Sequence, residues 1–293
     1  MITIPQKLYM NNQIVEVAMS GGIGNQLFQY SAGLSVSARL KAELVLDISW
    51  YQHSRGFSNF RTMELHRFVD LEGTGISTSR LNSKLRLAQR KIQNFAIVRD
   101  LTCDPVHLGS LDDHRNIRME GYWQSERYFT NIQYSLRKSI AKGDFVSDLS
   151  FGLAHEIEST ICIGLHIRRG DYITNPNALA YHGVCDAEYF NRGVKYVRGS
   201  QPIERIYLFS DDIDWCQKNL DFGIETRIVE DNICDTDQLK LLSLCNHQVI
   251  SNSSFSWWAA WLGKTTDQVV VYPRFWFANQ TNLESMPAGW ISM

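Results

Sequence analysis

Hydrophobic and polar positions alternate along this chain in a way that predicts short buried strands separated by helices. Most of the apolar runs are continuous, which is typical of strands covered on both faces. The predicted strands span residues 13–19, 43–47, 116–120, 161–167, 204–209, 226–230, 247–251 and 268–272. The predicted helices span residues 25–40, 125–141, 186–197, 211–220, 236–245 and 254–263. This alternation indicates an α/β fold with parallel sheets.

The two halves of the chain differ in regularity. Strands and helices follow one another through short connections from residue 161 to 272, whereas the first half contains long aromatic-rich segments such as residues 48–68. A polar, glycine-bearing stretch at residues 145–153 marks the change. We therefore expect two Rossmann-like domains facing a cleft, residues 1–150 and residues 151–293, with the last helix or tail able to pack back on the first domain.

The composition of the chain restricts the classes of protein to which it can belong. The chain has 293 residues, of which 44% are hydrophobic, so it can bury a sizeable core. A formal charge of −2 gives no global field for nucleic acid, so any anion site must be built locally. The cysteines form no C-x-x-C pair, which favours reduced thiols and a cytoplasmic protein. They are Cys103, Cys162, Cys185, Cys216, Cys234 and Cys245.

Membrane contact is expected to be peripheral at most. No signal peptide and no long apolar stretch is visible in the sequence. Residues 83–95 have the pattern of a basic amphipathic helix, which fits either a solvated surface helix or a helix lying on a membrane.

A glycine-rich loop follows the first predicted strand. Gly22 and Gly24 match the first two glycines of a dinucleotide fingerprint and Asp47 ends the next strand, but Leu27 stands at the third glycine position. The match is therefore partial. Asn25 is expected at the start of the following helix, where it serves either as an N-cap or, with the backbone N–H groups, as an anion ligand.

The stretch "HIRRGDY" ends the first strand of the second half. His166 and Arg168 are expected on one face of this strand, and Arg169 lies nearer the turn. Two guanidiniums at the carboxyl end of a strand are suited to a diphosphate, because arginine binds phosphate oxygens bidentately. The alternative is a purely structural pair between an arginine and Asp171.

Two further strand ends carry polar residues. The serine-rich turn "SNSS" precedes a helix, and its hydroxyl and backbone N–H groups are candidate phosphate donors, whereas the tryptophans of that helix are expected in the core. Asp211 and Asp212 follow another strand and are candidates for contacting a ribose or base. Asp212 and Asp214 formally make a D-x-D motif, but we expect no metal, because the arginines can neutralise a diphosphate. The turn comprises Ser251, Asn252, Ser253 and Ser254.

Taken together, these segments resemble the α-1,2-fucosyltransferase family. The stretches that carry the resemblance occur in the family's order over nearly the whole chain: "GGIGNQLFQYSAG", "GYWQSERYF", "HIRRGDY", "FSDD" and "SNSSFSWWAAWL". Ala259 replaces a common glycine and Ile23 a common leucine, and neither change affects the expected chemistry. The membrane anchor of animal relatives is not seen, which implies a bacterial enzyme.

The resemblance implies a GT-B fold, GDP-fucose as donor, no cofactor and inversion at the fucose carbon. The acceptor is expected to be a galactose-terminated oligosaccharide or glycolipid, as in O-antigen or other surface glycan synthesis, bound mainly by the first domain. The second domain is expected to hold GDP-fucose. By motif position, Arg168 neutralises the β-phosphate, Arg169 and Asp171 order the turn, and Asn25 reaches the diphosphate. His166 lies near the nucleotide, and the phosphate-binding turn is Ser253, Ser254 and Phe255.

Several questions stay open at this stage. The catalytic base is not assigned: Asp171 lies beside arginines, and His53, His66 and Asp47 are alternatives that are more often structural. The loop at residues 48–68, with Trp50, Tyr51, His53, Arg55 and Phe57, is either a sugar platform or a loop packed by its own aromatics. Other hypotheses are a fucosyltransferase of another linkage, an NAD-dependent oxidoreductase and a non-catalytic sugar-nucleotide or glycan-binding module.

Overall fold

The computed structural model describes most of the chain. Its described segments are residues 13–53, 61–78, 94–100, 115–140, 145–229, 232–263, 267–278 and 286–293. The expected basic helix lies outside them except for its last two positions, Asn94 and Phe95. Arg55, Phe57 and Cys103 also lie outside.

The chain forms two compact units, Met1–Lys142 and Gly143–Met293. The expected boundary after residue 150 falls inside helix α5 (Asp148–Glu158). This helix belongs to the second unit, because it packs on helix α10 (Asp235–Leu244) and the Asp237 carboxylate accepts hydrogen bonds from the backbone just before it.

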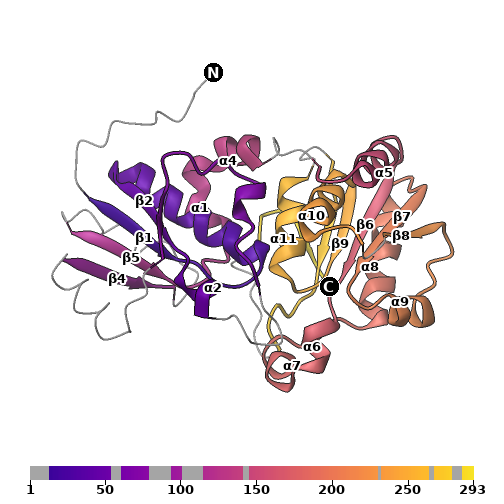
Figure 1. Ribbon diagram of the computed structural model, residues 1–293. Coiled ribbons are helices and arrows are strands. Elements are labelled where there is room, and N and C mark those ends of the chain that lie inside the picture. Colours follow the sequence, from indigo (N-terminus) through magenta and orange to yellow (C-terminus); the bar gives the residue numbers. More distant parts are fainter. Residues whose placement is uncertain are drawn as a thin grey trace. The chain divides into compact units, whose positions relative to one another are not determined.

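The first unit is built on a parallel sheet of five strands in the order β3-β2-β1-β5-β4. Its strands are β1 (Ile14–Ala18), β2 (Glu43–Asp47), β3 (Gly75–Ser77), β4 (Phe95–Arg99) and β5 (Asn116–Glu120). Its helices are α1 (Ile23–Leu40), α2 (Ser49–His53), η1 (Leu65–Arg67), η3 (Glu126–Ile132) and α4 (Gln133–Ile140). Helix α1 lies against one face of the sheet (Figure 1), and the missing side chain of Gly33 lets it approach Val17 and Leu44 closely.

The second unit is built on a six-stranded parallel sheet in the order β11-β10-β9-β6-β7-β8. Its strands are β6 (Cys162–Ile167), β7 (Arg205–Ser210), β8 (Thr226–Ile228), β9 (His247–Ile250), β10 (Val270–Tyr272) and β11 (Ile291–Ser292). Its further helices are α6 (Gly170–Thr174), α7 (Pro176–His182), α8 (Ala187–Ser200), α9 (Ile213–Asn219) and α11 (Ser254–Leu262). The chain runs outward from β6 to β8 and then returns to build the other side from β9, which is the Rossmann strand order.

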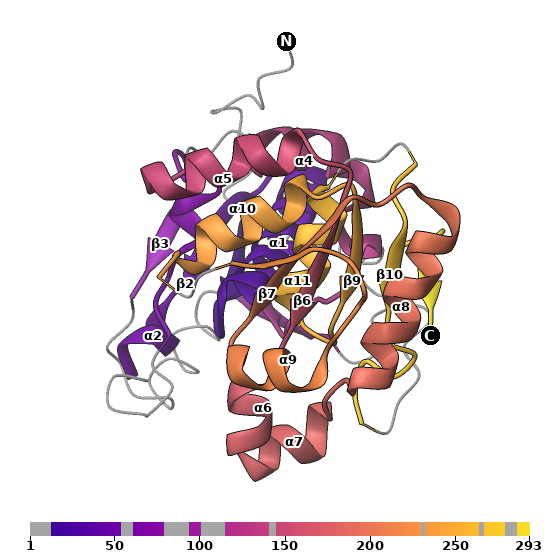
Figure 2. The same ribbon diagram turned by 90° about the vertical axis from the view of Figure 1, so that its right-hand side faces the viewer.

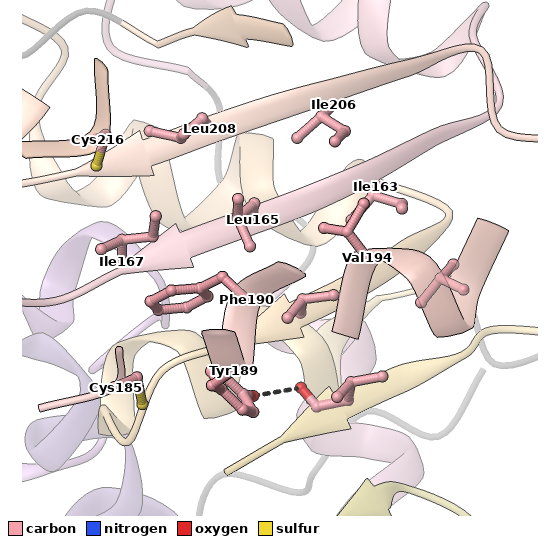
Figure 3. Packing of buried hydrophobic residues seen from close by; sticks show 13 residues of the cluster. Ile163, Leu165, Ile167, Cys185, Tyr189, Phe190, Val194, Ile206, Leu208 and Cys216 are labelled. Atoms are coloured by element: carbon pink, nitrogen blue, oxygen red, sulfur yellow. Dashed lines mark hydrogen bonds between the residues drawn. The ribbon is translucent and has the colours of Figure 1, made fainter. Parts of the chain in front are cut away.

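Helices cover both faces of this second sheet. Helix α8 lies on one face, and α10 and α11 lie on the other (Figure 2). On the α8 face, Phe190 and Val194 pack against Ile163 and Leu165 of β6 (Figure 3). Both faces of β6 are buried, so its sequence reads as a continuous apolar run.

All eight predicted strands and all six predicted helices are present, with small shifts at their ends. Two details differ. The expected helix at residues 125–141 is divided into the 3-10 helix η3 and α4, and within η3 the fully buried Phe129 adopts a non-helical φ of −135°. The chain end, which we expected could return to the first domain, supplies strand β11 beside β10.

Candidate functional site

The second sheet has its topological switch point between β6 and β9, which are neighbours in space but are separated by β7 and β8 in sequence. In open α/β sheets, ligands bind beyond the carboxyl ends of the strands at such a point. The "HIRRGDY" and "SNSS" segments follow these two strands directly. The fold therefore places both motifs at the position where a nucleotide ligand is expected.

Arg168 is held by two carboxylates. Its Nη2 donates to Asp171 Oδ1 at 2.7 Å and its Nη1 lies 2.9 Å from Asp211 Oδ2. Burial acts to lower the pKa of Arg168, but the charges of Asp211 and Asp171 outweigh it and raise the pKa. The guanidinium is therefore fixed and charged. Within the part of the chain that is described, its Nε makes no hydrogen bond, so the guanidinium keeps a donor for a ligand.

Arg169, in contrast, contacts residues that follow the neighbouring strand β7. Its Nε donates to Asp212 Oδ2 at 3.0 Å, and its guanidinium lies 3.8 Å from the centre of the Trp215 ring. Asp212 also caps helix α9 by accepting from the Trp215 amide. Arg169 thus ties the turn after β6 to the start of α9, as its expected ordering role requires.

The two aspartates after β7 are engaged by the arginines. Asp211 contacts Arg168 and also accepts a hydrogen bond from the Arg169 amide at 2.8 Å. A side chain at Gly170 would place its Cβ 2.8 Å from Asp211 Oδ2, so glycine is required there for this close approach. The nucleoside contact expected for Asp211 or Asp212 stays a prediction.

His166 is buried at the junction of β6 and β9. Its Nδ1 lies 2.7 Å from Ser256 Oγ and 3.2 Å from Ser251 Oγ, and its ring stacks on Phe255 at 5.0 Å. Burial lowers the pKa of His166 to about 3, so the ring is neutral at physiological pH. It therefore positions the serine-rich turn and does not act as a cation.

Helix α11 begins at this turn without a side-chain cap. Ser253 is the N-cap residue, but its hydroxyl makes no capping hydrogen bond, and the first turn of the helix contains no acidic residue. The N–H groups of the first turn and the hydroxyls of Ser253 and Ser254 make no hydrogen bond to the described residues. These donors and the helix dipole favour an anion. The tryptophans of the helix are buried, as expected.

The polar groups of Asn252 make hydrogen bonds within the protein. Its Nδ2 donates to the carbonyl oxygens of His182 at 2.7 Å and Trp276 at 3.3 Å, and its own carbonyl accepts from the Tyr172 hydroxyl. The side chain thus connects the turn to helix α7. The contact with the nucleotide that we expected of Asn252 stays a prediction.

In the first unit, the glycine loop after β1 depends on Gly21. This residue has φ +79°, and a Cβ on it would lie 2.7 Å from Asn25 Nδ2. Gly22 has ordinary extended backbone and open space around it, and Gly24 is buried in the first turn of α1. Gln26 fixes the loop through hydrogen bonds to Gly21 and Thr62. The glycine with the strictest conformational need is therefore one residue earlier than the two in the partial fingerprint.

Asn25 is not the N-cap of α1, since that position belongs to Gly22. Its Oδ1 accepts a hydrogen bond from Gln124 Nε2 at 2.8 Å, which connects the "GGIGN" and "GYWQSERYF" motifs. No described residue accepts a hydrogen bond from Asn25 Nδ2. The capping interpretation is wrong, and the amide is oriented with a donor available to a ligand.

Sequence reasoning missed a buried ion cluster in the first sheet. Arg118 of β5 contacts Glu16 of β1, Asp47 at the end of β2 and Glu120, at 2.6, 3.0 and 2.9 Å. The detectable signal was a charged residue at the centre of each of two strands, "IVEVA" and "NIRME".

The candidate bases of the first unit are weakly supported. Burial acts to raise the pKa of Asp47, but hydrogen bonds from Ser49 and the charge of Arg118 outweigh it and lower the pKa. His66 is exposed in η1. Among the described residues, no group of His, Cys, Asp and Glu is arranged to hold a metal ion, and no helix is long and apolar enough to cross a membrane.

Two parallel sheets, one of them with Rossmann strand order, form an α/β fold of the GT-B kind. The fold is similar to that of the fucosyltransferase NodZ from Bradyrhizobium (TM-score 0.51, 14% identity, 87% of this chain and 93% of that chain). It is also similar to POFUT1 in complex with GDP (TM-score 0.50, 11% identity, 90% of this chain and 99% of that chain).

The family model "Glycosyl transferase family 11" matches residues 1–292, and the chain belongs to this family. Its relatives include the alpha-1,2-colitosyltransferase of Escherichia coli, 28% identical over 95% of this chain and 98% of the relative. The O-antigen biosynthesis glycosyltransferase WbnK of Escherichia coli is 29% identical over 94% and 99%. The galactoside alpha-(1,2)-fucosyltransferase 2 of Oryctolagus cuniculus is 23% identical over 50% of this chain and 44% of the relative.

Proposed function

We propose that this glycosyltransferase transfers L-fucose from GDP-fucose to the 2-hydroxyl of a terminal β-galactoside, with inversion, in the synthesis of O-antigen or another surface glycan. The observation that carries the proposal is the pairing of a fixed, charged Arg168 with the uncapped start of α11 at the carboxyl ends of β6 and β9. The names of the relatives support the sugar and the pathway class.

The proposed step is a direct displacement. The galactoside oxygen forms a bond to the anomeric carbon of fucose while the bond to the β-phosphate oxygen breaks, and GDP leaves with the electron pair. Charge therefore develops on the diphosphate, where Arg168 and the N–H groups of Ser254 and Phe255 are suited to stabilise it. Preorganised donors of this kind contribute about 3–4 kcal/mol each in enzymes where one has been removed. We propose no metal for this role.

The hydroxyl proton must pass to a base as the oxygen attacks. Asp171 is a poor candidate because its carboxylate is paired with Arg168, and a nearby cation favours the ionised form of a carboxylate. Asp47 is disfavoured for the same reason through Arg118. The base is therefore left unassigned. We also propose that Asn25 takes part in the transfer, because its position in the motif matches that of a residue that reaches the diphosphate.

A colitosyl donor is the second candidate, because a colitosyltransferase is 28% identical over nearly the full length of both chains. The arginine and helix start described above would serve any GDP-linked sugar equally. Discrimination must come from contacts with the sugar ring.

The test is a donor and acceptor panel. The purified protein is incubated with GDP-fucose or the colitosyl donor and with lactose or other β-galactosides, in the presence of EDTA, and GDP release and the linkage of the product are measured. We expect a 2-linked fucosyl galactoside and turnover that EDTA does not abolish. Absence of GDP release with every galactoside would contradict fucosyl transfer, and faster release with the colitosyl donor would favour the second candidate.

A further inference from the structure

Two amide side chains meet at the topological switch point of the first sheet. Strands β1 and β5 pair in parallel inside this sheet, although β2, β3 and β4 lie between them in sequence (Figure 1). In open α/β sheets, ligands bind beyond the carboxyl ends of the strands at such a point. Asn25 follows β1 in the first turn of α1, and Gln124 follows β5. Gln124 therefore lies where a ligand is expected, and the proposed transfer step does not use it.

The hydrogen bond between these two amides has a definite direction. Gln124 Nε2 donates to Asn25 Oδ1 at 2.8 Å, so the oxygen end of the Asn25 amide is occupied, whereas its Nδ2 donates to no described residue. An amide has one donor end and one acceptor end, so the bond that fixes one end also decides which end faces a ligand. Asn25 thus presents an N–H donor, which suits an oxygen on which negative charge develops.

The turn that carries Gln124 is held in an uncommon backbone conformation. Trp123 is buried and has φ +57°, a region that residues other than glycine rarely adopt. Its amide donates to Asp100 Oδ2 at 2.7 Å, while Asp100 Oδ1 accepts from the Tyr128 hydroxyl at 2.8 Å. Gly121 has φ +144°, and a Cβ on it would clash with the Asp100 side chain. The Asp100 carboxylate thus maintains this turn against its strain.

The glycine loop is connected to the same turn by a second glutamine. Gln29 of α1 is buried, and its Nε2 donates to the Gly121 carbonyl oxygen at 3.0 Å. Its Oε1 accepts from the Ser20 amide at 3.0 Å. The two loops are therefore fixed to each other independently of the bond between Asn25 and Gln124. Removal of the Gln124 amide should free the Asn25 side chain without loosening the backbone around it.

We infer that Gln124 is a positioning residue for the transfer reaction, because it holds the Asn25 amide with its N–H donor toward the ligand. The inference rests on the proposed function for the part that Asn25 takes in transfer. Asn25 supplies the donor, and Gln124 acts only through Asn25. A strained turn that the surrounding structure maintains is typical of functional sites, which agrees with this role.

A double-mutant cycle measures whether Gln124 acts through Asn25. Asn25→Ala should lower kcat with GDP-fucose and a galactoside about a hundredfold. Gln124→Ala should lower it about tenfold, because one hydrogen bond no longer orients the amide. The double variant should be no slower than Asn25→Ala, since Gln124 then has nothing to orient. The matched control is Gln133→Ala, which removes a partly buried amide on α4 and should keep wild-type kcat.

Two results of this cycle would overturn the inference. The first is that the two losses multiply in the double variant, because Gln124 would then act independently of Asn25. The second is that Gln124→Ala keeps wild-type kcat while Asn25→Ala does not.

Gln124→Glu keeps the shape of the side chain but reverses its hydrogen bonding. A carboxylate accepts and does not donate, so it would bind Asn25 Nδ2 and turn the amide oxygen toward the ligand. Gln124→Glu should therefore lower kcat more than Gln124→Ala does. In the Asn25→Ala background, the two changes at Gln124 should have the same effect. A further loss from Gln124→Glu in that background would show that the carboxylate acts directly on the ligand, which contradicts a positioning role.

NMR of the full chain separates this inference from the proposed function, because it needs no turnover. The side-chain NH2 signals of Asn25 in a proton–nitrogen correlation spectrum are identified by their absence in Asn25→Ala. Gln124→Ala should shift these signals and Gln133→Ala should not, whatever sugar is transferred. Unchanged signals in Gln124→Ala would refute the inference even if GDP-fucose is turned over. Shifted signals together with wild-type kcat in Asn25→Ala would overturn the proposed part of Asn25, and Gln124 would then position no reacting group.

Discussion

At the residue scale, Arg168 is the side chain on which the donor chemistry depends most. Arg168→Ala should reduce kcat by about 10²–10³, because the charge that develops on GDP then loses its cationic partner. Arg168→Lys should recover only part of this, since an ammonium lacks the planar fork that binds phosphate bidentately. Steady-state kinetics with GDP-fucose and a galactoside give the values.

Arg192→Ala is the matched control for this prediction, because Arg192 is an exposed arginine on α8 of the same unit. It should leave kcat and the melting temperature unchanged. Activity of Arg168→Ala equal to that of Arg192→Ala would leave Arg168 with the purely structural pairing to Asp171 and Asp211.

The glycine loop gives a second residue-level prediction with an internal control. Gly21→Ala should lower the free energy of unfolding by about 1–3 kcal/mol, because φ +79° is strained for alanine and the new methyl group would displace Asn25. It should also lower activity if the amide of Asn25 takes part in transfer. Gly22→Ala has open space and an ordinary φ of −78°, so it should be nearly neutral. Chemical denaturation and kinetics of both variants, together with Asn25→Ala, test this.

The contrast between Gly21 and Gly22 also shows what cannot be predicted from the sequence. The "GGIGN" pattern indicated a tight turn, but a fingerprint cannot say which glycine has positive φ or that an asparagine amide covers it. The ordering role expected of Arg169 is compatible with the structure, and the expected nearness of His166 to the nucleotide stays a prediction. The pairing of Asp211 with Arg168 could not be predicted, because it joins the ends of two strands more than forty residues apart.

Three histidines with lowered pKa values determine whether the stability of the protein rises or falls with pH. Burial lowers the pKa of His166 to about 3 and lowers the pKa of His182 and His247. As the pH falls below the unfolded value of about 6.5, the unfolded chain binds protons that the folded chain does not, so stability decreases toward acid. Denaturation between pH 7.5 and 5 should show this loss, and His166→Asn should show a smaller one. A stability that rises on acidification over this range would contradict the assignment of a neutral His166.

At the element scale, the start of α11 is the feature with the clearest test. An acidic residue in the first turn of a helix stabilises it, typically by about 0.3–1 kcal/mol, and this turn has none. Ser254→Asp should therefore stabilise the protein and at the same time weaken GDP binding, because a carboxylate would compete with the phosphate for the same N–H groups. Thermal denaturation and calorimetry with GDP measure the two effects, and Ser254→Asn is the uncharged control.

Opposite signs for the two effects are what distinguish an anion site from an ordinary helix start. If Ser254→Asp stabilises the protein and binds GDP as tightly as the wild type, the turn holds no phosphate. If the serine hydroxyl alone matters, Ser254→Asn and Ser254→Asp should weaken GDP binding equally.

The elements that were not predicted from the sequence have more than one cause. Strands β3 and β11 are only three and two residues long and are partly exposed, so neither forms a continuous apolar run. Helix α5 was not predicted, because its first residues lie in the polar stretch at residues 145–153 where we expected the domain boundary. Strands such as β6 were identified well because burial on both faces leaves a continuous apolar run.

At the scale of the whole molecule, the chain combines two units of the same general architecture with different local charge. The described site of the second unit presents arginines and a helix start, whereas in the first sheet the carboxylates of Glu16 and Asp47 contact the buried Arg118. A formal charge of −2 for the whole chain could not reveal this difference. The arginines and the helix start therefore suit the second unit to an anionic donor.

This division predicts that donor binding belongs to the second unit. Residues 143–293 contain their own six-stranded sheet, with helices on both faces, and the candidate donor-site residues from His166 to Phe255. We expect the fragment 143–293 to fold, to bind GDP with a Kd within about tenfold of the full chain and to transfer no sugar. Circular dichroism establishes the fold, and calorimetry with GDP measures the affinity. The fragment carrying Arg168→Ala is the matched control and should lose the binding. A folded fragment that binds no GDP would show that residues 1–142 supply an essential part of the donor site.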